Sequence, residues 1–197
     1  MQINLAEFSL INILDSCSVW NILSSTKIYI TSLSAGCHFS FTKYVEYECL
    51  VKPRKHPTAN DAALRELLIK EIAKKKFQTH EISINDLQSI GLPEDRKRLG
   101  KGELSSIAFA KKTNQTFLTD DKAARTFAKK VLGTEQVQTT PHLVGHLFYK
   151  RHLLDGDLNV ILAEHNAYIA SNWGRLDNFF KSVYEESLRI RLMETTK

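Results

Sequence analysis

Cysteine is scarce in this chain, and long apolar runs are missing from it. The three cysteines, Cys17, Cys37 and Cys49, form no Cys-x-x-Cys pair and leave an odd number. This spacing argues against a disulfide framework or a cysteine-type zinc site, and it favours a reducing, cytoplasmic setting. No apolar run approaches the roughly 18 residues that a membrane span needs. The first residues also lack the basic start and small-residue cleavage site of a signal peptide, so we expect a protein with no membrane partner.

The overall composition is that of an ordinary globular protein with a surplus of positive charge. Hydrophobic residues make up 43% of the 197 positions and charged residues 25%, which is enough for one substantial core. The formal net charge of +5 favours an anionic partner. A basic surplus alone identifies no ligand, because many basic proteins bind no nucleic acid.

Short apolar runs alternate with segments of helical spacing as far as residue 150. This alternation predicts an α/β fold with a parallel-rich central sheet and helices on both faces. We expect Ser16 or Ser18 to cap the first helix, and Gly133 to end the helix that follows residue 120. The expected strands cover residues 9–14, 27–31, 79–84, 115–120 and 136–140. The expected helices cover residues 19–23, 41–50, 61–77 and 100–112, a short stretch closed by Gly91 and Pro93, residues 121–132 and a segment from Pro141.

The C-terminal part of the chain shows helical spacing and no further strand. We expect residues 1–156 to form the domain, and residues 157–197 to add a C-terminal helical extension of two helices, broken near Asn172-Trp173-Gly174. About forty residues is near the size below which an isolated domain needs a metal, a disulfide or a partner to fold. The apolar side of the extension is therefore expected to pack on the same domain. The alternatives are that a second copy of the chain or another protein buries it.

Acidic residues follow two of the expected strands. Asp15 comes directly after residues 9–14, and Asp120 and Asp121 follow the strand that ends near Thr119. Ligands of open parallel sheets bind outside the carboxyl ends of the strands. Carboxylates gathered there repel one another unless a cation neutralises them, and oxygen ligands suit Mg²⁺ or Mn²⁺. A single Asp after a strand is more often a helix cap or turn former, so the spacing leaves both interpretations open.

Four segments, in order, resemble the motifs of PIN-domain nucleases, and the resemblance covers roughly residues 10–156. The third segment carries Glu where many relatives carry Asp, and the last two segments together are the most specific. Residues 52–78 form a longer and more basic connection than compact PIN toxins have. In chain order the segments are LDSCSVW with Asp15, VEYE with Glu48, GKGELSSIAFA with Glu103, and FLTDDKAARTFAKKVLG with Asp120 and Asp121.

This resemblance implies a PIN-like fold and a metal-dependent endoribonuclease that uses Mg²⁺ or Mn²⁺. Asp15, Glu48, Glu103 and Asp121 would be both the catalytic and the metal-binding residues. Alignment to the family's T-x-D pattern favours Asp121 over Asp120, which is then a second choice or a supporting partner. Single-stranded or structured RNA is the implied substrate. The toxin half of a toxin–antitoxin pair is the implied role, with an antitoxin protein and a homodimer as possible partners.

Two other classes of protein remain as alternatives. One is a catalytically inactive PIN-like module that binds RNA or a protein through its basic surface. The other is a phospho-acceptor receiver domain, which also carries acids at strand ends. A receiver places its acid pair near the N-terminus, whereas the pair in this chain comes late, so the receiver ranks low.

Basic residues surround the proposed ligands in the sequence. Ten Lys or Arg residues and five acids lie between Glu94 and Lys130, and a basic rim around an acidic centre suits phosphate binding. For each lysine alone, a solvated helix face is the simpler interpretation. The residues expected to contact nucleic acid are Arg125, Lys122, Lys101 and Arg98.

Other groups of histidine and cysteine residues in the sequence do not indicate a functional site. His142 and His146 are four residues apart, but HLVGH lacks the Glu of a His-Glu-x-x-His zinc motif and no third ligand is evident. No motif supports Cys17 as a nucleophile, and a small buried role suits it better. Hydroxyl groups of Ser16 or Thr119 are expected to orient a neighbouring carboxylate.

Overall fold

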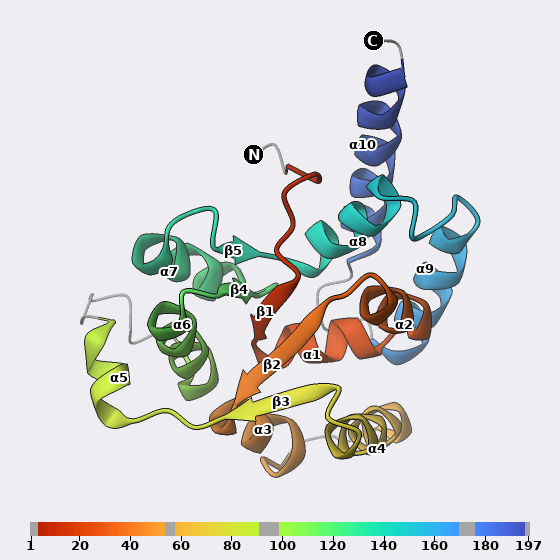
Figure 1. Cartoon of the computed structure of the whole chain (residues 1–197). Helices are drawn as coiled ribbons and strands as arrows, with labels where there is room; N and C mark the ends of the chain where they lie inside the picture. The colour runs from red at the N-terminus through yellow and green to blue at the C-terminus, as the bar shows by residue number, and fades with distance from the viewer. Residues whose placement is uncertain (1–3, 54–57, 91–98, 170–175, 196–197) are drawn as a thin grey trace.

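Five parallel strands form one sheet in the part of the chain that the structure describes. The computed structural model describes residues 4–53, 58–90, 99–169 and 176–195. The strand order is β3-β2-β1-β4-β5, and every neighbouring pair is parallel (Figure 1). The expected α/β fold with a parallel sheet is therefore confirmed. The strands are β1 (Ile11–Leu14), β2 (His38–Thr42), β3 (Phe77–His80), β4 (Thr116–Leu118) and β5 (Val137–Gln138).

Helices cover both faces of the sheet, and adjacent strand residues point to opposite faces. Leu14 and Leu118 join the larger hydrophobic cluster, whereas Ile13 and Phe117 join the smaller one on the other face. The helices of the larger cluster are α1 (Ser16–Leu23), α2 (Thr26–Ser34), α3 (Lys43–Leu50) and α4 (Ala59–Ala73). Those of the smaller cluster are α5 (Ile84–Ser89), α6 (Lys101–Thr113) and α7 (Lys122–Leu132).

The chain winds in two directions away from β1. It passes from β1 to β2 and β3 over one face, then crosses back over the other face to β4 and β5. The carboxyl ends of β1 and β4, which are hydrogen-bonded neighbours, therefore flank the point where the winding reverses. In open α/β sheets this is where ligands bind, because the helices leave in opposite directions and open a crevice.

One expected strand was wrong in the first forty residues. Residues 27–31 are helical and belong to α2, because the Ser25 side chain caps the helix at Ile28 N and the buried Ile28 and Ser32 are one turn apart. The strand is instead β2, whose Phe39 and Phe41 fill the larger cluster. The helix expected over residues 41–50 therefore begins later, at Lys43, because residues 41 and 42 belong to β2.

The cap of the first helix also differs from the expectation. Asp15, rather than Ser16 or Ser18, is the N-cap of α1, and its side chain accepts a hydrogen bond from Ser18 N. At the other end of the sheet Gly133 ends α7 with a φ of 95°, as expected. The stretch with Gly91 and Pro93 lies outside the described residues.

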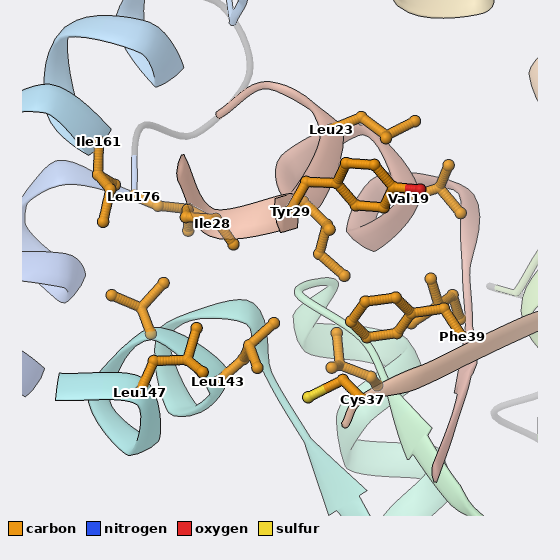
Figure 2. Packing of buried hydrophobic residues seen from close by; sticks show 14 of the residues in the cluster. Val19, Leu23, Ile28, Tyr29, Cys37, Phe39, Leu143, Leu147, Ile161 and Leu176 are labelled. Carbon is orange, nitrogen blue, oxygen red and sulfur yellow. The ribbon is translucent and has the colours of Figure 1, made fainter. Parts of the chain in front are cut away.

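Three C-terminal helices pack on the larger cluster. They are α8 (Thr140–Tyr149), α9 (Asp157–Tyr168) and α10 (Asp177–Thr195). Leu143 and Leu147 of α8 point toward Ile28 of α2, with Ile161 of α9 and Leu176 beside them (Figure 2). The C-terminal helical addition to the sheet is thus part of the architecture, and α10 runs along α8 before it extends past the sheet (Figure 1). Within the described part of the chain, no helix is both long and apolar enough to cross a membrane.

Polar contacts fix α9 against α2. Glu164 accepts hydrogen bonds from the Ser25 hydroxyl at 2.6 Å and from Lys27 N at 3.2 Å. Lys27 Nζ also lies 2.9 Å from Asp157, and Ser24 Oγ lies 2.8 Å from His165 Nδ1. The expected break at Asn172-Trp173-Gly174 lies outside the described residues. The division at residue 156 stays a prediction, and these contacts favour an extension that packs on the domain.

Replacing Phe180 tests whether the extension belongs to the same folding unit. Phe180 of α10 is fully buried, so Phe180→Ala should lower the free energy of unfolding by about 3–5 kcal/mol. Phe179→Ala is the matched control, because the neighbouring ring is 60% exposed and should change stability little. Chemical denaturation monitored by circular dichroism measures both. Equal, small effects of the two variants would show that α10 folds apart from the domain.

Candidate functional site

Asp15 lies at the carboxyl end of β1, where it is almost fully buried. Its backbone N–H donates to Leu118 O of the neighbouring β4 at 3.4 Å. The carboxylate accepts two hydrogen bonds, from Ser18 N at 2.7 Å and from the Thr119 hydroxyl at 2.5 Å. Burial, with a smaller contribution from the nearby charge of Asp120, raises the pKa of this carboxyl to about 7 despite these hydrogen bonds. A buried acid with this pKa is costly to ionise unless a cation compensates it.

Asp120 and Asp121 follow β4 and differ in their surroundings. Both carboxylate oxygens of Asp120 are engaged: Oδ2 accepts from Asn21 Nδ2 at 2.8 Å and from the Thr140 hydroxyl at 2.5 Å, and Oδ1 accepts from Thr140 N at 2.9 Å. Asp121 is exposed and uses Oδ1 to cap α7, accepting from Ala124 N at 2.7 Å. Asp120 is thus held by α1 and α8, whereas Asp121 faces solvent at the start of α7.

Glu48 reaches the site from α3 and contacts the start of α6. Gly102 N donates to Glu48 Oε1 at 3.3 Å, and the Ser16 hydroxyl is a second hydrogen-bond partner. Burial raises the pKa of Glu48, and repulsion from Glu103 raises it further. A Cβ atom at residue 102 would lie 2.8 Å from the carboxyl carbon of Glu48. Only glycine therefore leaves room for this carboxylate, which gives the second Gly of GKGE a physical role.

Glu103 lies in the first turn of α6 and has an unsatisfied oxygen. Its Oε2 is buried and has no hydrogen-bond partner among the described residues. A Cβ atom at Gly100 would lie 2.5 Å from the same oxygen, so the first glycine of the motif also makes room for a carboxylate. A buried carboxylate oxygen without a partner is costly, and a bound cation would remove that cost.

Two buried serines fix α6 to the edge of the sheet. Ser106 Oγ donates to Leu14 O at 3.0 Å, one residue before Asp15. Ser105 Oγ lies 2.6 Å from Thr42 Oγ1, and Thr42 caps α3, the helix that carries Glu48. The serine pair that follows Glu103 therefore sets the position of α6 against both β1 and α3.

Cys17 shows that the acids gather in one place. Burial raises the pKa of its thiol, and four carboxylates raise it further in the order Asp15, Asp120, Glu103 and Asp121. A thiol surrounded in this way stays protonated, which agrees with the absence of a nucleophile motif around it. Glu48 belongs to the same set because the charge of Glu103 raises its pKa. We name the set of Asp15, Glu48, Glu103, Asp120 and Asp121 the acidic group.

The donor chemistry of the acidic group fits a hard divalent cation. All its donor atoms are carboxylate oxygens, two of the carboxyls have raised pKa values, and Glu103 has a buried oxygen without a hydrogen-bond partner. Within the part of the chain that is described, no three His, Cys, Asp or Glu side chains are grouped as the ligands of one metal ion would be. Four of the acids lie close enough to Cys17 to raise the pKa of its thiol, whereas the grouping of the acids around one ion and their roles as ligands stay predictions.

The basic residues expected near the site are placed unevenly. Arg125 is partly buried, and its Nη1 lies 3.4 Å from Asp120 O. Lys101 and Lys122 are exposed in the first turns of α6 and α7, close in sequence to Glu103 and Asp121. Arg98 lies outside the described residues. Their contacts with nucleic acid stay predictions.

Sequence reasoning missed the polar residues that hold the acids. Thr119 was expected to orient a carboxylate, and the structure places its hydroxyl on Asp15. Asn21 and Thr140 were not expected, although Thr140 follows β5 and strand ends are where such residues gather. His142 and His146 bond backbone oxygens of Asn4 and Leu5, respectively, which gives these histidines a structural role.

The raised pKa of Asp15 predicts a pH-dependent stability that Asp15→Asn should remove. The native pKa of about 7 lies above the ordinary value of 3.8, so the native state binds this proton more tightly. The contribution is complete below about pH 4 and is lost as the pH rises to about 7, at a cost of roughly 4 kcal/mol. In EDTA, the variant should therefore be more stable than the native sequence at pH 8, with a smaller difference at pH 5.

Urea unfolding at both pH values measures this effect. Asp155→Asn is the control, because the side chain of Asp155 is 67% exposed. Loss of stability in Asp15→Asn at both pH values would contradict the buried, repelled state of Asp15.

Comparison with known proteins agrees with this arrangement. A family model described as a PIN domain matches residues 39–140, slightly more than half of the chain. The match includes Glu48, Glu103, Asp120 and Asp121, whereas Asp15 lies before it. A search of curated proteins and a search of solved structures gave no significant match. From the matched residues, the parallel α/β fold and the acids at the strand ends, we conclude that the chain belongs to the PIN-domain family.

Proposed function

We propose that this PIN-domain protein is a metal-dependent endoribonuclease that cleaves RNA phosphodiester bonds. PIN domains have a nuclease-type fold, which makes a hydrolase acting on nucleic acid the starting point. The observation that carries the proposal is the buried Asp15 at the reversal of the sheet, repelled by Asp120 and surrounded by further carboxylates. Ionising such a group costs stability, and a bound cation would offset that cost, which supports a ligand at this place.

Asp15, Glu48, Glu103 and Asp121 would hold one or two Mg²⁺ or Mn²⁺ ions. When bound, such an ion activates a water and stabilises negative charge on the phosphate. Asp120 has both oxygens hydrogen-bonded to Asn21 and Thr140, so it supports the loop that presents Asp121. Asp121 is the better ligand because it is exposed and its cap uses one oxygen only.

The remaining polar groups of the site would orient the acids and the substrate. The Thr119 hydroxyl fixes the direction of the Asp15 carboxylate, and Gly102 N fixes that of Glu48. Lys101, Lys122 and Arg125 lie where α6 and α7 begin, so their charges can hold phosphates beside the acidic group. Arg98 would extend this surface along the chain before α6.

The wider role follows from the family and stays part of the proposal. The protein would act in the cytoplasm as the toxin of a toxin–antitoxin pair, with an antitoxin as protein partner and a homodimer as its assembly. The described residues offer apolar side chains for such contacts on α10, where Leu192 is 67% and Met193 is 55% exposed.

A second candidate function is a PIN-like module that binds RNA or protein without cleaving it. It is favoured by one observation: in the described residues the carboxylates are not grouped at ligating distance. Metal binding by the intact protein distinguishes the two candidates, because only the nuclease needs the acids to close around a cation.

Cleavage of single-stranded RNA with Mn²⁺ or Mg²⁺ is the direct test. The native sequence should cleave, EDTA should stop it, and Asp15→Asn or Glu103→Gln should lower the rate by at least about 100-fold. Mn²⁺ should also raise the melting temperature of the native protein and not that of Asp15→Asn. RNA binding without cleavage, together with no response to Mn²⁺, would instead support the binding module.

Gly102→Ala tests the role of Glu48 without touching a carboxylate. The added Cβ would displace Glu48, and a misplacement of about 1 Å can cost roughly 100-fold in rate. Alanine also favours a helix by up to about 1 kcal/mol, so activity should fall without a matching loss of stability. Gly156→Ala is the matched control, because no atom lies within 4 Å of a Cβ there. Full activity in Gly102→Ala would show that Glu48 has no role in cleavage.

A further inference from the structure

A cavity of about 550 Å³ opens beside the acidic group. It lies between α7, the junction of β5 and α8, and the start of α10. Asp120 of the acidic group lines it, together with Arg125. Cavities that bind small organic ligands have volumes of about 300–1,000 Å³, so this one can hold a nucleoside. Its position means that a strand bound at the acidic group would pass the mouth of this cavity.

Gln138, one of the residues that line the cavity, has an unsatisfied hydrogen-bond acceptor. The residue lines the cavity at the end of β5 and is only 3% exposed. Its Oε1 is buried and has no hydrogen-bond partner among the described residues. An amide oxygen kept in this state is costly, and an N–H group of a ligand would satisfy it. Nucleobases carry such N–H groups on their edges, and glutamine is a common partner for them.

Phe179 gives the cavity an aromatic surface for stacking. Its ring is 60% exposed and lines the cavity from the first turn of α10. Val137, Pro141 and Leu176 add apolar walls. An exposed aromatic ring beside apolar walls suits the face of a planar heterocycle, because unstacked bases of RNA bind by stacking on such rings.

The charges that line the cavity favour a neutral group inside it. The lining has two basic residues, Arg125 and Lys129, and three acids, Glu7, Glu135 and Asp120. A phosphate deep in the cavity would meet these acids, whereas an uncharged base would not. Arg125 lies next to Asp120, so it can hold a phosphate at the boundary between the cavity and the acidic group.

We propose that this cavity binds one unstacked base of the RNA strand, next to the phosphate that lies at the acidic group. Gln138 accepts a hydrogen bond from the base edge and Phe179 stacks on its face. The substrate is then single-stranded RNA, because a base within a duplex is paired and stacked and cannot enter. This inference rests on the proposed function of the acidic group, but the binding step itself needs no metal.

Binding of mononucleotides to Asp15→Asn in EDTA tests the cavity apart from cleavage. At least one of the four nucleoside 5′-monophosphates should bind, and ribose 5-phosphate, which has no base, should bind about tenfold more weakly. Gln138→Met and Phe179→Ala should each weaken the nucleotide about tenfold. Gln136→Met is the matched control, because the Gln136 side chain bonds Asn114 outside the cavity and its loss should change nothing. Because the Phe179 ring is exposed, Phe179→Ala should fold normally, so weaker binding by this variant cannot be attributed to misfolding.

The outcomes separate this proposal from the nuclease proposal. Nucleotides that bind no better than ribose 5-phosphate would overturn the base cavity, and so would binding that Gln138→Met and Phe179→Ala leave unchanged. Base-dependent binding without RNA cleavage in Mn²⁺ would support the cavity and overturn the nuclease. In a protein that does cleave, Gln138→Met should reduce the base preference beside the cut and raise KM about tenfold. An unchanged base preference would overturn the proposal.

Discussion

The repulsion that Asp15 and Glu48 experience from neighbouring carboxylates at one end of the sheet is the constraint on which the local structure depends. Each of four acids accepts a backbone N–H from the N-terminal turn of a helix: Asp15 from α1, Glu48 from α6, Asp121 from α7 and Asp120 from α8. Helix N-termini carry partial positive charge, so four of them aimed at one place offset part of the repulsion. The parallel sheet makes this possible, because its strands all end at the same edge and a helix begins after each.

The sequence could predict much of this site because the pattern is local. An acid directly after a buried apolar run marks the carboxyl end of a strand, and this held for Asp15 and for Asp120-Asp121. The helix of residues 27–31 could not be read in the same way, because Ile28 and Tyr29 suit a strand by themselves. What decides it is the cap from Ser25 together with the competing strand at Phe39 and Phe41.

The partners of the acids lay beyond sequence reasoning for a different reason. Asn21 and Thr140 meet Asp120 only because α1 and β5 come to the same edge of the sheet, far apart in the chain. The two glycines of GKGE stand out in the sequence, but the sequence does not show why glycine is needed there. Each faces a glutamate, one on its own helix and one on α3, and this contact exists only in three dimensions. Gln138 likewise stands out only once its oxygen is seen to be buried and unpaired.

The strand order has a consequence for how the protein comes to exist. β1 begins near the start of the chain, yet its neighbour β4 is among the last strands to be synthesised. Pairing them requires a contact across about a hundred residues, and such distant contacts form late in folding. A nascent chain that ends before β4 holds Asp15 and Glu48 but not the loop with Asp120 and Asp121. The acidic group is therefore a property of the assembled sheet, and a nascent chain cannot form it before β4 and the loop after it have been made.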